Sequence, residues 1–454
     1  MRAGLPAALF VAGLLLRLGG LFFNGMVDLD EMLLDWGAAV ARYGLADAFG
    51  INYGVFSYAA FGLATAGADL MPRFWWAPYK LLVLGFDLGV LAALRQLVPR
   101  RAWTVVLVLY WVNPWFVLHE AYHGFWEAPH VLMGLTAVLA LRRLRAAASG
   151  IAAWTVVGIA LACSAMFKPQ GLIYFVGPVG LVLLAMTFRG RARPLAALLA
   201  GIASVVLAVS LWFWAAGGPP LAVVDNYRSA LTVMPAASNG GPGLWRFVTF
   251  VYMVVTGETG HVATARMPGL MLAVISEVAA LLCLALIAAL AVAIRRARSR
   301  QADVALAPET LLLTLAFGAL VMSQFGVRAH INHTYTALVL LMPLAASPGA
   351  VQKLWVAMAA LLGVSHVLIY GLGRPALLPP DAAARYPAAP ALIAAIEDQA
   401  LDPALGGLLD VQAGISRLLS AIPAEMIVSL LSVPVFVVAC LLVRALLRKA
   451  GTAA

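Results

Sequence analysis

The chain has 454 residues, of which 63% are hydrophobic and only 11% are charged, and its mean hydropathy is +0.95. A soluble domain has about a quarter charged residues. This composition therefore excludes a water-soluble fold and indicates a bundle of membrane-spanning helices, which satisfy their own backbone hydrogen bonds. The net charge of +10 does not indicate nucleic-acid binding, because the basic residues form short clusters between apolar runs, where they determine membrane topology.

Apolar runs long enough to cross a bilayer recur along the chain. We expect an all-α, polytopic bundle of about 12 spans of roughly 20 residues each, near residues 6–23, 76–97, 103–118, 124–141, 151–166, 170–187, 194–216, 269–294, 309–327, 334–348, 354–371 and 426–446. Residues 53–71 are also apolar, but if they crossed the membrane, the orientation of every later span would be reversed. We therefore expect them to be re-entrant or interfacial. The three cysteines lie inside apolar runs and form neither a disulfide framework nor a zinc motif.

With the N-terminus in the cytoplasm, every dense basic cluster falls in a cytoplasmic loop or tail, as the positive-inside rule requires. These clusters contain Arg95, Arg100 and Arg101; Arg142, Arg143 and Arg145; Arg189, Arg191 and Arg193; Arg295, Arg296, Arg298 and Arg300; Lys353; and Arg444, Arg448 and Lys449. The reverse orientation would place all of them outside, so the sequence predicts one topology.

The loops divide the chain into three parts. Residues 1–371 are predicted to form the transmembrane core, with a first outside loop at 24–52. Residues 372–425 begin with prolines and continue as an amphipathic run that would lie on the membrane surface outside the cytoplasm. Residues 426–454 contain the last span and a basic cytoplasmic tail.

Three carboxylates follow the first span within four residues: Asp28, Asp30 and Glu31. Like charges at this spacing repel one another, so some of them must be hydrogen-bonded, bound to a cation or shifted in pKa. A carboxylate with a suitable pKa can act as a general base. The alternative is a solvated acidic loop.

Residues 113–130 (NPWFVLHEAYHGFWEAPH) contain three histidines and two glutamates among aromatic residues. A metal site is conceivable, but Gly124 and Pro129 break the helix that would present the ligands. We expect these side chains to hydrogen-bond a sugar or phosphate, with Trp126 or Trp115 as a stacking platform; they are His119, Glu120, His123, Glu127 and His130. The alternative is a set of interfacial side chains that anchor helix ends.

A lone lysine, Lys168, precedes Pro169 and Gln170 between two spans on the outside face. A lysine among apolar runs is costly and suggests function, and a phosphate group would pair with it. The alternative is a lysine that extends to the lipid headgroups.

Residues 328–335 also lie at an outside end between two spans and contain Arg328, His330, His333 and Tyr335. An arginine beside two histidines is suited to anion binding. The alternative is an ordinary polar connection.

The order of these motifs resembles the GT-C superfamily of polytopic glycosyltransferases. The best match is its polyprenyl-phosphate-mannose-dependent branch, which includes the catalytic subunit of GPI mannosyltransferase I and related bacterial enzymes. Residues 6–345 carry the resemblance, through Asp30, Trp36 to Gly44, Tyr53 to Tyr58, Asn113-Pro114, Gly124 to Glu127, Lys168-Pro169-Gln170 and, loosely, Asn332 to Tyr335. The chain departs from the branch at Phe125 and Glu127, which replace a Gln and an Asp.

The resemblance implies an inverting transfer of a hexose, mannose in that branch, from a polyprenyl-phosphate donor to an extracytoplasmic lipid or glycan acceptor. Asp30, with Asp28 or Glu31 nearby, would be the general base in the first outside loop. The donor phosphate would be bound by Lys168, Arg328, His330 and His333. The substrates would also contact His123, Trp126, Glu127, Gln170, Tyr53 and Tyr335.

The expected partners are this donor, the acceptor and membrane lipids, with no nucleic acid. The expected location is a bacterial cytoplasmic (inner) membrane, with the active site facing outward. No cofactor is required by the sequence, and a divalent ion, Mg²⁺ or Mn²⁺, is left open.

Two other functions compete with this hypothesis. A transporter or flippase of lipid-linked saccharides would have charges at mid-membrane and paired half-repeats, yet the sequence indicates at most Asp87 and Glu277 there and no repeat. A non-catalytic subunit of a membrane complex would need no base, so Asp30→Asn would change nothing.

Overall fold

The computed structural model describes residues 4–452 except 24, 26, 51–52, 145–149, 188–191, 231–236, 239–240, 259–260, 263–266, 299–306, 372–377, 379–380, 398–406, 408–409, 412–413, 416–417 and 419–421. The side chains at 27–28, 186–187, 229–230, 298 and 452 also lie outside the described part. Within these limits the chain is built of helices and their connections, with no β-strand. The all-α prediction is confirmed.

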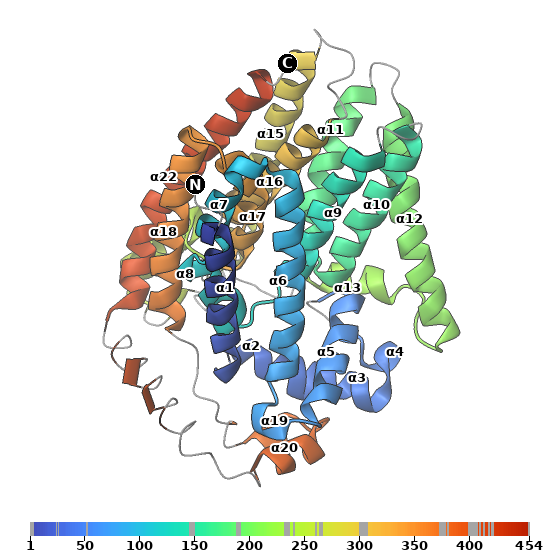
Figure 1. The fold of residues 1–454 in the computed structure, drawn as a ribbon, viewed down its shortest axis with the longest axis vertical. Coiled ribbons are helices and arrows are strands. Elements are labelled where there is room, and N and C mark those ends of the chain that lie inside the picture. The colour runs from blue at the N-terminus through green and yellow to red at the C-terminus, as the bar shows by residue number, and fades with distance from the viewer. Residues whose placement is uncertain are drawn as a thin grey trace.

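Eight described helices are long and apolar enough to cross a membrane. They are α1 (Gly4–Gly19), α6 (Ala77–Leu97), α10 (Gly150–Phe167), α12 (Ala192–Ala215), α15 (Gly269–Arg298), α16 (Pro308–Phe325), α18 (Ala350–Tyr370) and α22 (Ala424–Thr452). They pack side by side as one bundle (Figure 1). Helix length and composition thus make the chain an integral membrane protein.

One further helix pair is long and apolar enough only when its two halves are taken together. Residues 100–111 and 114–122 qualify together but meet at an angle of 54°. The first half contains η4 (Arg100–Ala102), α7 (Trp103–Val106) and η5 (Leu107–Trp111), and the second contains α8 (Pro114–Val117) and η6 (Leu118–Tyr122). The break is at Asn113, whose side chain accepts a 3.0 Å hydrogen bond from the Trp115 backbone N–H. Proline at the next position favours a new helix start.

The other three predicted spans form shorter helices. They are α9 (Ala128–Leu144), η7 (Leu172–Val176) continued by α11 (Gly177–Thr187), and α17 (His333–Ala345). Helix α17 has 13 residues, about 20 Å of helix, and is buried along its length against α16. It is an inner helix of the bundle rather than one that faces lipid.

The N-terminal outside loop forms a set of short helices at one end of the bundle (Figure 1). They are η1 (Gly20–Phe22), α2 (Val27–Asp30), η2 (Glu31–Gly37), α3 (Ala38–Tyr43), α4 (Leu45–Ala48) and α5 (Val55–Ala68), followed by η3 (Pro72–Phe74). Helix α5 has 14 residues, about 21 Å, which is less than the hydrocarbon thickness of about 30 Å. It corresponds to the segment expected to be re-entrant or interfacial.

Helix α5 approaches η2 closely at Gly37. A Cβ atom at this position would lie 2.2 Å from the Thr65 Oγ1 and 2.7 Å from the Phe61 carbonyl oxygen. Thr65 also donates a 2.9 Å hydrogen bond to the Leu33 carbonyl. Glycine therefore allows the loop to pack firmly on α5.

The rest of the described chain lies between and below these helices. It comprises α13 (Ala222–Ala230), α14 (Leu244–Thr256), α19 (Ala382–Arg385) and α20 (Pro390–Glu397). Helices α19 and α20 lie at the same end as α3 and α5 (Figure 1). They belong to the predicted amphipathic loop 372–425, most of whose later part lies outside the described residues.

The basic helix ends lie at the other end of the bundle. Helices α6 and α9 finish there together, where Arg142 donates a 2.7 Å hydrogen bond to the Gln96 carbonyl. Helix α6 begins next to α5 and runs away from it (Figure 1). The described basic ends of α6 and α9 and the short helices α2–α5 therefore occupy opposite ends, as the charge pattern predicts.

Candidate functional site

Several predicted motifs lie where regular helix is interrupted. The π-helical turn η2 directly follows Asp30, and η6 contains His119. A third π-helical turn, η7, begins two residues after Gln170. Such turns cost helix stability and are frequent at functional sites. The predicted break at Gly124 is confirmed, because Gly124 has φ +71° and separates η6 from α9.

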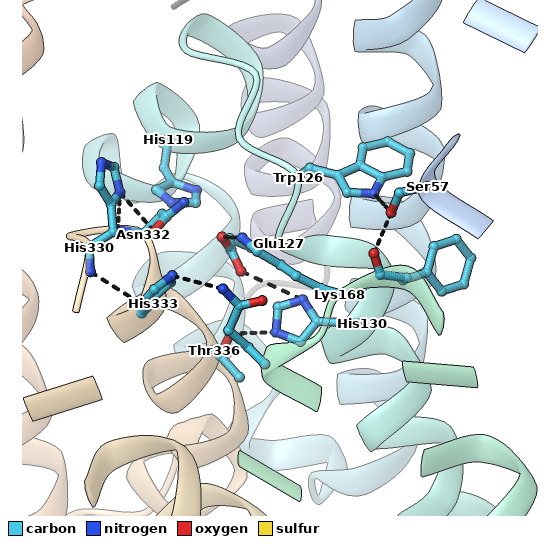
Figure 2. A network of polar contacts seen from close by, with 12 residues as sticks. Ser57, His119, Trp126, Glu127, His130, Lys168, His330, Asn332, His333 and Thr336 are labelled. Atoms are coloured by element: carbon cyan, nitrogen blue, oxygen red, sulfur yellow. Dashed lines mark hydrogen bonds and ion pairs between the residues drawn. The ribbon is translucent and has the colours of Figure 1, made fainter. Parts of the chain in front are cut away.

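A buried ion pair forms the centre of the site. Glu127, just before α9, and Lys168, just after α10, are 1% and 3% exposed, and the Lys168 ammonium bonds directly to the Glu127 Oε1. The other Glu127 oxygen lies 3.5 Å from the His130 Nδ1. A buried charge is tolerated only with such compensation, so each partner holds the other in place (Figure 2).

A chain of polar contacts extends from this pair toward α17. The Gln170 amide lies 3.3 Å from the His333 Nε2, and the His333 Nδ1 accepts a 3.1 Å hydrogen bond from the His330 backbone N–H. His130 contacts the Thr336 hydroxyl at 2.9 Å. Figure 2 shows these side chains converging from separate helices. The structure thus brings together Glu127, Lys168, Gln170 and His333, as predicted.

More histidines surround Phe125. The His123 Nδ1 lies 2.6 Å from the His366 Nε2, and the Phe125 ring packs against His119, His330 and His366, with centroid distances of 4.6, 5.8 and 5.6 Å. Six of the seven histidines of the chain therefore lie in or beside one cluster. We define the histidine cluster as His119, His123, His130, His330, His333 and His366.

Tyrosine and tryptophan connect this cluster to the first outside loop. The Lys168 ammonium lies 5.5 Å from the centroid of the Tyr53 ring, and Tyr53 packs on Trp36 of η2 at 5.6 Å. Trp126 donates a 2.6 Å hydrogen bond to the Ser57 hydroxyl. The Trp126 ring is only 1% exposed, with protein rings around it, so in this conformation it holds α5 against α9 rather than presenting a face to a ligand.

The predicted base, Asp30, is 5% exposed at the end of α2. Tyr386, between α19 and α20, lies close enough for the Asp30 charge to affect it: burial raises the pKa of the Tyr386 hydroxyl, and Asp30 raises it further. Arg42 donates a 3.2 Å hydrogen bond to the Pro387 carbonyl. Helices α19 and α20 thus cover the first loop. Glu31 is exposed.

The remaining predicted residues have different positions. The Asp28 side chain lies outside the described residues. Arg328 is half-buried with φ +61°, and its Nε is buried without a hydrogen-bond partner among the described residues. Tyr335 lies deeper in the bundle, where its hydroxyl contacts the Tyr110 hydroxyl at 2.9 Å.

Sequence reasoning missed a second group of buried charges. The Arg17 guanidinium bonds to Asp87, and Tyr110 donates to the other Asp87 oxygen. Lys80 and Glu120 are also buried, at 2% and 1% exposure. Asp87 was named from the sequence but Arg17 and Lys80 were not, although a lone basic residue inside an apolar run signals such a site.

Other contact residues carried no clear sequence signal. Ser57, Thr336 and Tyr370 are ordinary residues of apolar helices, yet they bond to Trp126, His130 and His330 respectively. Such partners are identified only by packing.

Among the residues that the structure describes, no group of three or more His, Cys, Asp or Glu side chains could hold a metal ion. Mg²⁺ and Mn²⁺ prefer oxygen ligands, and Glu127, the carboxylate beside the histidine cluster, is already paired with Lys168.

The fold and the site define an all-helical integral membrane protein with a buried polar cluster toward one end of its bundle. No protein-family model matches the chain, and no curated protein has a significantly similar sequence. The resemblance to GT-C glycosyltransferases therefore depends on the motifs alone.

Proposed function

We propose that the protein is a membrane glycosyltransferase of GT-C type that transfers a hexose, mannose by resemblance, from a polyprenyl phosphate to an extracytoplasmic acceptor. The observation that carries the proposal is the convergence of Lys168, Gln170 and the histidine cluster beside a loop that contains a buried carboxyl group, Asp30.

The anion side of the site supports a phosphate donor. Lys168 is positioned by Glu127, and His333 and Gln170 are in contact with each other. Arg328 lies on the connection to His330 and has a buried Nε without a described partner. Preorganised donors of this kind stabilise the negative charge that develops on a leaving phosphate.

The carboxyl side supports general base catalysis. Asp30 would take the proton of the acceptor hydroxyl while the oxygen of that hydroxyl forms a bond to the anomeric carbon of the donor sugar. The bond from that carbon to the phosphate oxygen breaks, and the polyprenyl monophosphate leaves with the electron pair. Attack opposite the phosphate inverts the anomeric centre. Asp30 is buried and lies beside Tyr386, which would limit access of water as an acceptor.

The topology supports an extracytoplasmic site. Asp30 lies in the set of short helices opposite the basic ends of α6 and α9 (Figure 1), and basic ends mark the cytoplasmic side. A lipid-linked donor would reach the site from the bilayer, and its polyprenyl chain would lie along the apolar helices.

The proposal is tested by transfer of radiolabelled mannose from polyprenyl-phosphate mannose in membranes that contain the protein. Asp30→Asn is expected to lower the rate about 100-fold or more, as for loss of a general base. Asp47→Asn is a matched control, because Asp47 is an exposed carboxylate of the same loop, and its rate is expected to stay within about twofold of wild type.

The outcomes separate the hypotheses, provided that both variants insert and accumulate normally. Equal loss in both variants would contradict a specific role for Asp30. Undiminished transfer by Asp30→Asn would exclude it as the base. Absence of transfer by the wild type would contradict the proposed donor.

A lipid-linked saccharide flippase is the second candidate, favoured by the buried Arg17–Asp87 pair and Glu120 inside the bundle. It predicts that proteoliposomes without acceptor translocate a labelled lipid-linked saccharide and that Arg17→Met abolishes this movement. We expect no translocation above protein-free liposomes. Translocation without transfer would replace the enzyme hypothesis.

A further inference from the structure

A histidine and a glutamate next to each other in the chain form a buried pair that the proposed reaction has not used. The His119 Nδ1 lies 3.2 Å from the Glu120 Oε1, and the two side chains are 0% and 1% exposed. Both residues belong to the π-helical turn η6, in the second half of the bent helix pair 100–111 and 114–122. Glu120 therefore occupies one of the two ring nitrogens of His119.

Aromatic rings fix the orientation of His119. Its ring lies between Tyr335 and Phe125, with centroid distances of 4.7 and 4.6 Å and interplanar angles of 10° and 26°. The Phe125 backbone N–H also bonds to the His119 carbonyl at 3.1 Å. A ring stacked on both faces and bonded through Nδ1 cannot rotate without disturbing all three neighbours.

The opposite ring nitrogen has no partner. The His119 Nε2 is fully buried and makes no hydrogen bond among the described residues. A buried polar atom without a partner is costly and calls for an explanation such as a missing ligand. The other polar atoms of the same pair do not solve this, since the free Glu120 Oε2 is also unpartnered.

The neighbours of His119 indicate what the ligand is. His123, Lys168 and His330 lie near enough for their charges to act on its ring. Figure 2 draws His119 on the same side of Glu127 as His330 and Asn332. Lys168 and the imidazoles around the ring can donate hydrogen bonds, and such donors favour an anion rather than a second cation.

We propose that His119, positioned by Glu120, is a further phosphate ligand that donates a hydrogen bond from Nε2 to an oxygen of the donor phosphate. This inference rests on the proposed function, because it names an additional group for the same donor. Glu120 acts through His119 and is a positioning residue.

The chemistry of the pair permits this donation. If Glu120 is protonated, its O–H donates to the His119 Nδ1, and the neutral ring carries its hydrogen on Nε2. If instead His119 carries both ring protons, Nε2 is again a donor. The negative charge of an incoming phosphate favours both of these states over the one in which Nε2 is bare.

The test is equilibrium binding of a short-chain polyprenyl monophosphate, and of the matching polyprenol, to the full-length protein in detergent. His119→Asn should weaken phosphate binding about tenfold or more, as expected for loss of a hydrogen bond to a charged group. His119→Gln should stay within about threefold of wild type, because its amide nitrogen replaces the Nε2 position. Polyprenol binding should change in neither variant.

Glu120 provides a second test that does not alter the histidine. Glu120→Gln retains a hydrogen bond to the His119 Nδ1 and should bind the monophosphate almost as wild type does. Glu120→Ala removes the bond and should weaken monophosphate binding about three- to tenfold, again without an effect on polyprenol.

The possible failures are distinguishable. Equal monophosphate affinity in wild type and His119→Asn, or an equal loss with Asn and Gln at position 119, would overturn the role of His119 alone. A parallel loss of polyprenol binding would show that the pair has only a structural role. If wild type itself bound polyprenyl monophosphate no better than polyprenol, the proposed donor would be overturned together with this inference.

Discussion

Two buried lysines of this protein have different environments. Lys80 in α6 is 2% exposed and, within the described part of the chain, donates to three backbone carbonyls, those of Gly20, Phe23 and Tyr122. Lys168 is 3% exposed and pairs with the Glu127 carboxylate beside Tyr53. Both are intramembrane or near-membrane cations, which by default suggest function, yet only one has neighbours that a substrate could use.

The partners of each lysine explain the difference. The three carbonyls that accept hydrogen bonds from Lys80 lie just after the end of α1, just after η1 and at the end of η6. The Lys80 charge therefore meets the negative ends of helices, and all three of its N–H donors are used. The surroundings of Lys168 contain unpartnered polar atoms, among them the Gln170 Oε1 and the His119 Nε2. We therefore interpret a buried charge as structural where all of its hydrogen bonds are made within the protein. Where neighbouring polar atoms lack hydrogen-bond partners, the charge is a candidate for ligand binding.

The largest effect is expected at Lys168. Lys168→Met should lower transfer about 100-fold or more through loss of a preorganised cation, and should also destabilise the protein by about 3–5 kcal/mol, because Glu127 becomes a buried unpaired charge. The double variant Lys168→Met with Glu127→Gln should regain most of the stability and none of the activity. Unfolding in detergent and the mannose transfer assay measure the two effects; recovery of transfer in the double variant would contradict the role of Lys168.

Lys80→Met should show the reverse pattern. Three carbonyls would lose their donor, which should cost about 3 kcal/mol or more of stability, while transfer per folded molecule should stay within about threefold of wild type. Fluorescence-detected size exclusion gives the folded fraction by which the rate is divided. A folded Lys80→Met protein without transfer would place Lys80 in the site and end the contrast with Lys168.

The smallest effect concerns Asp35 in η2, which lies outside the spans. Burial raises the pKa of Asp35, so the folded state favours the protonated form, and wild type should lose a little stability as the pH rises from about 4 through the raised value. Asp35→Asn removes this loss. Its Tm should match wild type at pH 4 and exceed it by about 1 °C at pH 7.5. If Asp35→Asn had the higher Tm at pH 4 and lost this advantage at pH 7.5, the expected direction of the pH dependence would be contradicted.

The sequence anticipated much of the candidate site because its polar motifs interrupt long apolar runs. Glu127, Lys168, Gln170 and His333 were predicted to act together, and the structure pairs Glu127 with Lys168 and Gln170 with His333. The sequence places them on the same side of the membrane, because successive spans alternate in direction. Arg17 escaped notice, because a single charge in an N-terminal apolar run was read as part of that run.

What the sequence determined by itself is the class of protein: composition and span length require an integral membrane bundle of helices, since only a bilayer can cover this much apolar surface. The turn at Gly124 was also readable, because Gly acts locally, whereas the predicted span 103–118 ran straight through the break at Asn113. Only the tertiary structure decided which buried charges meet, that α17 lies inside the bundle and that Tyr386 lies beside Asp30. These depend on how each helix is rotated against its neighbours, and nearly uniform apolar helices leave that rotation to side-chain packing.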